Sequence, residues 1–289
     1  MYLGVHVSGI KKIYEAPEEA RKLGCNTMQI FTRSPLRWRE GRLTPADIQE
    51  FIQQRALCQI KPVFIHISYL INLASPDPRL YQGSIKAYID DIKEAEALGA
   101  EYIVTHMGSH KETSEQAGLA RLTEALRRII EKTSGSNVGI LLENTAGSGS
   151  WLGYTFGHQR QIIEGINRNR RVGLCLDTAH AYLAGYNLAT EEGLQQLVQE
   201  IDREVGLASL KLIHLNDARG ELGSHHDQHE HLGKGGIGLA GIKRIVNHPL
   251  LREKPFILET PKDTKGADLK NLLLVKKLTR AGGKERRGV

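Results

Sequence analysis

The sequence VGLCLDTAHAYLAGYNL, residues 172–188, opens with an apolar, β-favouring run from Val172 to Leu176 that stops at Asp177. His180 follows three residues later, in the turn that leaves the run. A buried parallel strand that delivers a carboxylate and then an imidazole at its C-terminal end is a typical layout for a metal site. A simpler interpretation is that Asp177 caps a helix and His180 lies on a loop. Recurrence of the same arrangement along the chain would favour the metal site.

Apolar runs alternate with helix-period segments along the whole chain. Strands are predicted at residues 2–7, 27–31, 62–67, 102–106, 138–143, 172–177, 210–215 and 255–259. Helices are predicted between them, at residues 16–23, 45–58, 78–98, 115–132, 190–205 and 239–246. Eight strands alternating with helices, without a linker or a change of composition, predict a TIM (β/α)8 barrel that forms one domain over residues 1–280. A doubly wound open sheet is the alternative, and residues 281–289 are expected to be a disordered tail.

The composition is that of an ordinary globular protein with a sizeable core. The 289 residues are 40% hydrophobic and 25% charged. Met1 leads directly into a strand-like run and no apolar stretch has the length of a membrane span, so neither a signal peptide nor a membrane partner is expected. The three cysteines, Cys25, Cys58 and Cys175, are far apart and read as reduced thiols, which favours the cytoplasm. A net charge of +6 is compatible with an anionic partner such as nucleic acid.

The predicted strands share a feature at their last residues. Six consecutive strands end in an imidazole or a carboxylate: His66, His106, Glu143, Asp177, His214 and Glu259. In a barrel the C-terminal ends of the strands converge on the face that carries active sites. We therefore expect these six side chains to form one metal site. His6 ends the first strand in the same way, and its role as a ligand, as support for a ligand or as a substrate contact stays open.

The loop after the seventh strand is rich in histidine. Residues 224–231 read SHHDQHEH, in which Asp227 and His229 alternate and could chelate one ion together with His180. The alternative is a solvated turn that takes up metal without a function. The other histidines of the tract are not expected to bind metal. We expect His231 to hydrogen-bond to a ligand, and His225 and His226 to be exposed.

A glycine-rich segment follows this loop. Residues 233–238 read GKGGIG, which matches the dinucleotide-binding fingerprint letter for letter. No strand of a Rossmann unit precedes it, so we interpret it as a tight turn that enters the helix at residue 239. The free N–H groups of such a turn could hold a backbone phosphate.

The quoted motifs resemble those of the endonuclease IV family of apurinic/apyrimidinic endonucleases. The matching segments are HVS at residues 6–8, HISYLINLASPD at 66–77, LLENTAGSG at 141–149, CLDTAHAYLAGY at 175–186, HLNDAR at 214–219, DQHEHLGKG at 227–235 and ILETP at 257–261. They occur in the family's order from about residue 2 to residue 280. The resemblance implies a TIM barrel that holds three zinc ions, with manganese as an alternative at one of them.

The resemblance also implies a grouping of nine metal ligands. One ion would take His66 and His106 and share Glu143 with a second ion. The second would also take Asp177, His214 and Glu259, and the third would take His180, Asp227 and His229. Glu143 and Glu259 are the expected catalytic carboxylates. The family usually has cysteine at Ala179 and lysine at Arg219, neither of which is a ligand.

The resemblance further implies that three side chains enter the base stack at a lesion. Tyr69 and Leu70 match two of them. The family's arginine aligns with Leu36, so either its neighbour Arg37 substitutes by a shift of one residue or Leu36 acts as an apolar wedge.

The predicted activity is hydrolysis of duplex DNA 5′ to an abasic site, which leaves a 3′-hydroxyl and a 5′-deoxyribose phosphate, together with trimming of blocked 3′ ends. A monomer without an obligate protein partner suffices for this reaction. Two alternatives stay open: a divalent-metal sugar isomerase or epimerase of the xylose-isomerase-like barrels, and a non-catalytic barrel that binds nucleic acid. The third ligand set, His180, Asp227 and His229, argues against the isomerase.

Overall fold

The computed structural model describes residues 1–8, 11–38 and 43–284. Eight strands form one parallel sheet in the order β1-β10-β7-β6-β5-β4-β3-β2. Their bounds are β1 (Leu3–Val5), β2 (Met28–Ile30), β3 (Val63–His66), β4 (Tyr102–His106), β5 (Gly139–Glu143), β6 (Val172–Asp177), β7 (Leu210–His214) and β10 (Phe256–Leu258). The two end strands meet through a parallel bridge between His6 and Gln29, where the Val7 N–H donates to the Gln29 carbonyl at 2.8 Å. The sheet therefore closes into the predicted TIM barrel.

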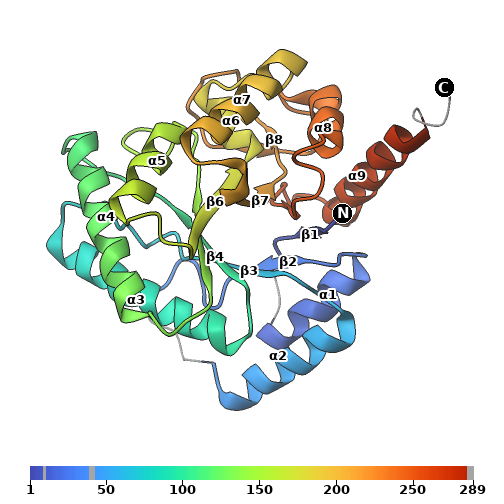
Figure 1. Cartoon of the computed structure of the whole chain (residues 1–289). Helices are drawn as coiled ribbons and strands as arrows, with labels where there is room; N and C mark the ends of the chain where they lie inside the picture. Colours follow the sequence, from blue (N-terminus) through green and yellow to red (C-terminus); the bar gives the residue numbers. More distant parts are fainter. Residues whose placement is uncertain (9–10, 39–42, 285–289) are drawn as a thin grey trace.

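Helices surround the strands (Figure 1). They are α1 (Ala16–Lys22), α2 (Pro45–Cys58), α3 (Pro78–Ala97), α4 (Glu115–Lys132), α5 (Phe156–Gly165), α6 (Thr178–Ala184), α7 (Glu191–Glu204), α8 (Gly238–Asn247) and α9 (Ala267–Lys284). Two of them start at capping side chains followed by proline. Thr44 and Asp47 form a reciprocal capping box around Pro45, and Asp77 accepts two backbone N–H groups at the start of α3. None of the helices in the described part of the chain is long and apolar enough to span a membrane.

Three helices were not among those predicted. Six of the seven residues of α6 are buried, so the helix has no polar face and hence no amphipathic period. α5 is short, and α9 follows the last strand. α9 continues to Lys284 and thus enters the segment expected to be a disordered tail, of which residues 285–289 lie outside the described residues. A small antiparallel pair, β8 (Asp217–Ala218) with β9 (His229–Glu230), also forms on the loop after β7.

The barrel interior is filled by one buried apolar layer. Its members are Phe64, Val104, Leu141, Cys175, Leu212 and Ile257, one from each of six strands. Side chains two residues apart on a strand point to the same face. The residues two positions further along these strands are the six predicted strand-end ligands, so the core layer and the candidate site share one side of the sheet.

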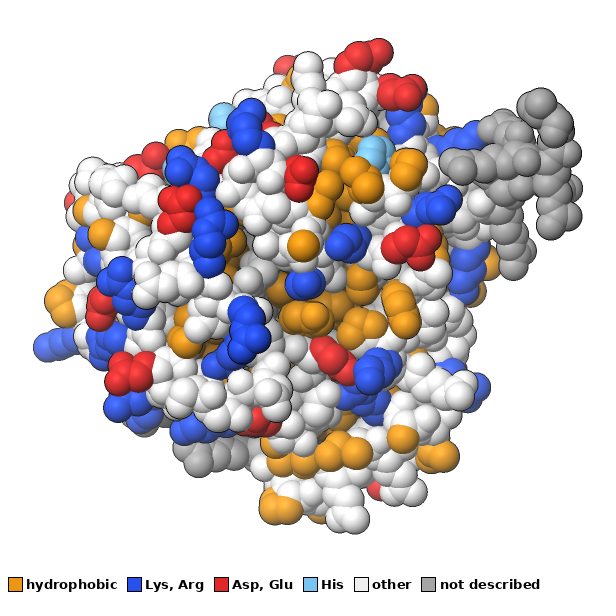
Figure 2. All heavy atoms as spheres, viewed as in Figure 1, with side chains coloured by type: hydrophobic (Ala, Val, Ile, Leu, Met, Phe, Trp, Pro, Cys, Tyr) orange, Lys and Arg blue, Asp and Glu red, His pale blue; other side chains and the backbone are white. Residues whose placement is uncertain are grey.

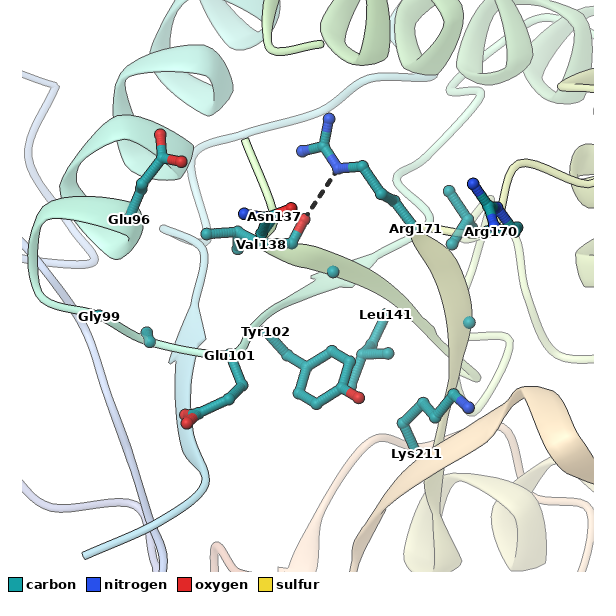
Figure 3. Close-up of a pocket in the computed structure, with 14 residues that line it drawn as sticks. Glu96, Gly99, Glu101, Tyr102, Asn137, Val138, Leu141, Arg170, Arg171 and Lys211 are labelled. Atoms are coloured by element: carbon teal, nitrogen blue, oxygen red, sulfur yellow. Dashed lines mark hydrogen bonds between the residues drawn. The ribbon is translucent and has the colours of Figure 1, made fainter. Parts of the chain in front are cut away.

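The opposite mouth of the barrel is a pocket of about 580 Å³ at the N-terminal ends of β4 to β7 (Figure 3). Tyr102 lies in it and stacks on Phe64, with the ring centroids 5.6 Å apart. Arg171 is anchored at the rim, because its Nε donates to the Val138 carbonyl at 3.0 Å. A side chain on Gly139 would meet the Tyr102 ring at 2.5 Å, so glycine is required there for packing. This end of the barrel serves closure and stability.

We expect opposite effects from alanine at two glycines. A Cβ on Gly4 would overlap the Thr27 carbonyl oxygen between β1 and β2, whereas a Cβ on Gly83 in α3 would meet nothing within 4 Å. Gly4→Ala should lower the free energy of unfolding by about 1–3 kcal/mol or more. Gly83→Ala should raise it by about 0.5–1 kcal/mol, because alanine loses less backbone entropy in a helix. Urea titration followed by circular dichroism measures both, and equal stability of the two variants would contradict this packing.

Candidate metal centre

The strand ends bring the predicted ligands together around Glu143. Its Oε2 lies 3.3 Å from His66 Nε2 and 3.1 Å from His106 Nε2. Its Oε1 lies 2.9 Å from His214 Nδ1. The two oxygens of this fully buried carboxylate therefore face different imidazoles, which is the arrangement of a carboxylate that bridges two ions.

The cluster divides into groups with the spacing of metal ligands. In each group the nitrogen and oxygen atoms lie within 4.8 Å of one another. The groups are His66–His106–Glu143, then Glu143–Asp177–His214–Glu259, and Asp177–His180–His229. The first two are the predicted ligand sets for a pair of ions.

The third group contains Asp177 where the predicted set has Asp227. The predicted set comes from α6, β9 and the loop before β9. His229 is held by the pairing of β9 with β8, and its Nε2 lies 3.4 Å from His180 Nε2. Asp227 Oδ1 lies 3.0 Å from the same nitrogen of His180. His180 is on helix α6 and not on the expected turn, because the strand passes directly into that helix.

Asp177 fits both interpretations made from the sequence, as a helix cap and as part of a metal site. It is the N-cap of α6, where its Oδ1 accepts the His180 N–H at 2.8 Å. Its Oδ2 lies 3.5 Å from His229 Nε2 and faces the cluster. Capping a helix and contributing to a metal site are therefore compatible for one carboxylate, because each role uses a different oxygen.

Backbone carbonyls set the protonation of several ring nitrogens. The Nδ1 atoms of three histidines lie 2.8–3.1 Å from carbonyl oxygens: His66 from Ile67, His180 from Asn144 and His229 from Glu259. Since a carbonyl only accepts, each Nδ1 carries hydrogen and each Nε2 can offer a lone pair to the cluster. This outer support is typical of metal-binding histidines. The mixture of imidazole nitrogen and carboxylate oxygen suits zinc.

The carboxylates are ionised despite their burial. Burial alone would raise the pKa of Glu143, but His214 and His106 hold that pKa well below its usual value. Asp227 is 45% exposed, so its desolvation is only partial, and its bond to His180 lowers the pKa of this carboxyl to about 2. Burial opposes the charged form of His180, but Asp177 and Asp227 raise its pKa well above the usual value. The pKa of His214 is likewise raised despite burial, by Cys175, Glu259 and Glu143. Because ligand imidazoles must be neutral, metal uptake would release protons.

Cys175 lies beneath this cluster, with Sγ within 4.8 Å of ligand atoms of Glu143 and His214. Burial raises the pKa of its thiol to about 12. Its side chain belongs to the buried apolar layer that lies two residues before the strand ends. It fills the barrel core.

Three buried amides that were not predicted support the ligands. Asn144 donates to the Asp177 carbonyl and accepts the Asp177 N–H, at 3.0 and 2.7 Å. Asn216 donates to Asp177 Oδ2 at 2.7 Å and accepts the Glu259 N–H at 2.8 Å. Gln29 contacts His6, His214 and Glu259. Of these three amides, Gln29 left a signal in the sequence, because it is a polar residue inside the apolar run of residues 27–31.

His6 and His231, the two histidines considered as supports for the ligands, lie in different parts of the structure. His6 Nδ1 is 3.3 Å from Glu259 Oε1, so it is in the centre. Burial lowers the pKa of His6. His231 is next to α9, where its Nε2 lies 3.0 Å from Asp263 Oδ1 and its Nδ1 lies 3.0 Å from the amide of Asn271. Among the described residues, none of its hydrogen bonds reaches a predicted ligand.

The expected DNA-contacting side chains lie near the centre or on exposed loops. Tyr69 is 54% exposed, with its ring centroid 5.8 Å from that of His66. Leu70 is half-buried, Arg37 is exposed and Leu36 is 73% exposed. On the face drawn in Figure 2, Lys and Arg are interspersed with Asp and Glu. The net positive charge therefore does not by itself mark a nucleic-acid surface there.

The phosphate role considered for residues 233–238 conflicts with the structure. The carboxylate of Asp217, which is fully buried, accepts the N–H groups of Gly233, Gly235 and Ile237 at 2.8, 3.1 and 2.9 Å. These amides are therefore already occupied. The interpretation as a turn that enters a helix is confirmed, because α8 begins at Gly238.

Asn216→Ala should weaken metal binding. The change leaves Asp177 Oδ2 without its 2.7 Å donor, and loss of such outer support costs about 10–100-fold in affinity. Metal retained per chain during titration with a competing chelator measures the effect. Asn247→Ala, on the distant helix α8, is the control and should bind as the unmodified protein does; equal affinities for both variants would contradict the role of Asn216.

Removal of metal should destabilise the protein. Buried carboxylates at the strand ends repel one another, and a ligand present at 1,000 times its Kd stabilises the folded state by about 4 kcal/mol. The melting temperature should fall after chelation and recover when zinc is returned. An unchanged melting temperature, in protein shown to have lost its metal, would contradict a coupling of this centre to the fold.

Comparisons with known proteins agree with this geometry. A family model described as a xylose isomerase-like TIM barrel matches residues 17–278. A probable endonuclease 4 of Halothermothrix orenii is 41% identical over 276 residues, which cover 94% of this chain and 99% of that protein. The crystal structure of endonuclease IV from Thermus thermophilus superposes with a TM-score of 0.86 at 35% identity, covering 97% of this chain and 100% of that chain.

A D-tagatose 3-epimerase-like protein also superposes, with a TM-score of 0.76, covering 99% of each chain. At 21% identity this likeness reflects the shared fold alone. The sequence match at about 40% identity over nearly the full length is of another kind, since it includes the segments that carry the predicted metal ligands. The chain therefore belongs to the endonuclease IV family, within the xylose isomerase-like TIM barrels.

Proposed function

We propose that this protein is a DNA repair endonuclease that hydrolyses the phosphodiester bond 5′ to an abasic site in duplex DNA. The products would be a 3′-hydroxyl and a 5′-deoxyribose phosphate, and the same site would trim blocked 3′ ends. The observation that carries the proposal is the bridging position of Glu143, between the pair His66–His106 and His214. The relatives named endonuclease 4 and endonuclease IV support it.

The ligand groups would hold three zinc ions, with manganese as an alternative at one site. His66, His106 and Glu143 would hold one; Glu143, Asp177, His214 and Glu259 a second; and His180, Asp227 and His229 a third. Zinc, when bound, supplies Lewis acidity that offsets the negative charge developing on the phosphate and the leaving oxygen. Imidazole-rich donor sets favour zinc over magnesium, which prefers oxygen ligands.

Glu143 and Glu259 are the carboxylates to which we assign the chemistry. Glu143 holds the imidazoles on both sides of it at fixed separation. Glu259 accepts from Gln29 at 2.6 Å, and its backbone N–H is bound by Asn216. These contacts orient both carboxylates before the substrate arrives, and such preorganisation is a main source of catalytic rate.

Specificity for abasic sites would come from the lower cost of extrusion. A nucleotide without a base has lost its stacking and pairing, so flipping it out costs less than the few kcal/mol of a normal nucleotide. Tyr69 and Leu70 would fill the gap, with either Arg37 or Leu36 as the third wedge. We infer that a monomer in the cytoplasm suffices for this reaction.

The alternative function is a sugar isomerase or epimerase with one or two divalent ions. It has no need of a third ligand set, yet His180 Nε2 lies 3.0 Å from Asp227 Oδ1 and 3.4 Å from His229 Nε2. A metal content near one ion per chain would favour the isomerase.

A duplex that carries one tetrahydrofuran residue tests the proposal, because this analogue cannot undergo β-elimination. The zinc-loaded protein should nick it immediately 5′ of the lesion and leave undamaged duplex intact. Glu143→Ala should still bind the duplex but cut it more slowly. The loss in rate should exceed the roughly 10–100-fold that is typical when a residue supporting a metal ligand is removed. Glu124→Ala, an exposed position on α4, is the matched control.

Two results would contradict the proposal. Unmodified protein that holds three zinc ions and does not cut the analogue would favour the isomerase. Normal cutting by Glu143→Ala would exclude the bridging role of this carboxylate.

A further inference from the structure

The β2 loop, which comprises residues 31–38 directly after β2, begins beside the metal centre. Phe31 at its start has its ring centroid 5.5 Å from that of His66. Further along, Leu36 is 73% exposed and Trp38 is 43% exposed. A loop that becomes ordered only when its partner binds weakens the complex, because the freedom it loses opposes binding. The contacts that hold this loop in the free protein therefore bear on any ligand of the metal face.

A buried ion pair anchors the β2 loop to helix α3. Arg33 Nη2 lies 2.7 Å from Asp91 Oδ2, and the two side chains are 16% and 2% exposed. The same nitrogen donates to the Ala87 carbonyl, one helical turn earlier, at 3.0 Å. Thr32 Oγ1 donates to the other oxygen of Asp91 at 3.4 Å. Two consecutive loop residues are thus fixed to one carboxylate of the helix.

The attraction between opposite charges carries the contact of Arg33 with Asp91. Among the described residues Asp91 Oδ2 has no hydrogen-bond partner. Burial raises the pKa of Asp91 to about 6 and Arg33 opposes that rise, so the carboxyl is ionised at neutral pH. Replacing a buried ion pair by apolar residues of similar volume is often neutral for stability. We therefore expect this pair to contribute a fixed geometry more than net stability.

A second contact joins the β2 loop to the segment that carries Tyr69 and Leu70. The buried Ser68 hydroxyl donates to the Pro35 carbonyl at 2.8 Å and accepts the Leu70 N–H at 3.3 Å. The Tyr69 ring packs edge-on against Phe31, with the centroids 5.5 Å apart. One hydroxyl and one aromatic contact therefore hold the two segments against each other.

We propose that Arg33 and Ser68 are positioning residues that hold the β2 loop and residues 68–70 as one preformed surface for duplex DNA. Arg33 fixes the loop to α3 through Asp91, and Ser68 fixes the two segments to each other. The role in DNA binding rests on the proposed function, since these segments carry the side chains expected to enter the base stack. The anchoring itself does not depend on that function.

Substitutions at Arg33 test the ion pair. Arg33→Gln removes the charge that faces Asp91, whereas Arg33→Lys keeps it. On the tetrahydrofuran duplex, Arg33→Gln should lose about 10-fold in kcat/KM, the effect of ordering one or two side chains on binding, and Arg33→Lys should recover most of this loss. Arg55→Gln is the matched control: Arg55 lies 2.6 Å from Glu101 Oε1 with similar burial, at the opposite mouth of the barrel. It should cut as the unmodified protein does.

Ser68→Ala is the milder variant, because it removes a single hydroxyl. It should lower kcat/KM by about 2–10-fold, the range for one hydrogen bond, and should keep the zinc content of the unmodified protein. Ser209→Ala is its control, because it removes a similar bond, from Ser209 Oγ to the Val205 carbonyl at 2.9 Å. Equal losses in Ser68→Ala and Ser209→Ala, or in Arg33→Gln and Arg55→Gln, would overturn the positioning role.

A double-mutant cycle separates positioning from stability. If Arg33 acts through the wedge of its own loop, Arg33→Gln should cost little once that wedge has been truncated. The truncations are Leu36→Ala and Arg37→Ala, and non-additivity with one of them identifies the wedge. Losses that add fully with both truncations would overturn the proposal, because a residue that affects only stability gives independent losses.

The fluorescence of Trp38 tests the anchoring without DNA. The chain has two tryptophans, so Trp151→Phe leaves Trp38 as the only one. In this background Arg33→Gln should lower the emission anisotropy of Trp38 and raise its quenching by acrylamide, whereas Arg55→Gln should change neither. Unchanged anisotropy and quenching in Arg33→Gln would overturn the anchoring. If the unmodified protein does not cut the duplex, the proposed function and the role in DNA binding fail together, while fluorescence alone decides the anchoring.

Discussion

A single buried carboxylate, Glu143, is the interaction on which the rest of the centre depends. It lies at the end of β5 with no exposed surface, and its two oxygens face imidazoles from β3 and β4 on one side and from β7 on the other. An ionised carboxylate without positive charge around it would be expensive at this depth. The surrounding histidines hold its pKa low, and bound cations would neutralise it further.

The closed parallel barrel is what makes this concentration of polar groups possible. Each of six strands places an apolar side chain in the interior and, two residues later, a predicted ligand at the C-terminal mouth. The buried apolar layer that includes Phe64 lies below the strand ends and excludes water from that side. The imidazoles and carboxylates above this layer face one another. Closure between His6 and Gln29 adds β1 and β2 to the same ring, which brings the amide of Gln29 to His214 and Glu259.

Hydrogen bonds from outside the ligand set give the histidines their direction. Carbonyl oxygens hold the Nδ1 atoms of His66, His180 and His229, while Gln29 holds the opposite nitrogen of His214. Each ring therefore presents its other nitrogen to the cluster. The protein thus orients its donor atoms through backbone and amide groups that do not titrate, and this leaves the carboxylates free for the metal ions.

The sequence by itself determined the strands, most of the amphipathic helices and which imidazoles and carboxylates stand at the strand ends. This was possible because hydrophobic periodicity and the position of a residue at a strand end are local properties of the sequence. The grouping of the predicted ligands into three metal sites came from the resemblance of the motifs to a known family. Only the tertiary structure decided that His180 lies on a helix, since a fully buried helix has no polar face to reveal it. It also decided that Asp217 accepts the N–H groups of Gly233, Gly235 and Ile237, and that Gln29 and Asn216 contact the predicted ligands. These contacts join residues far apart in the chain, and a hydrogen bond between distant residues leaves no periodic trace in the sequence.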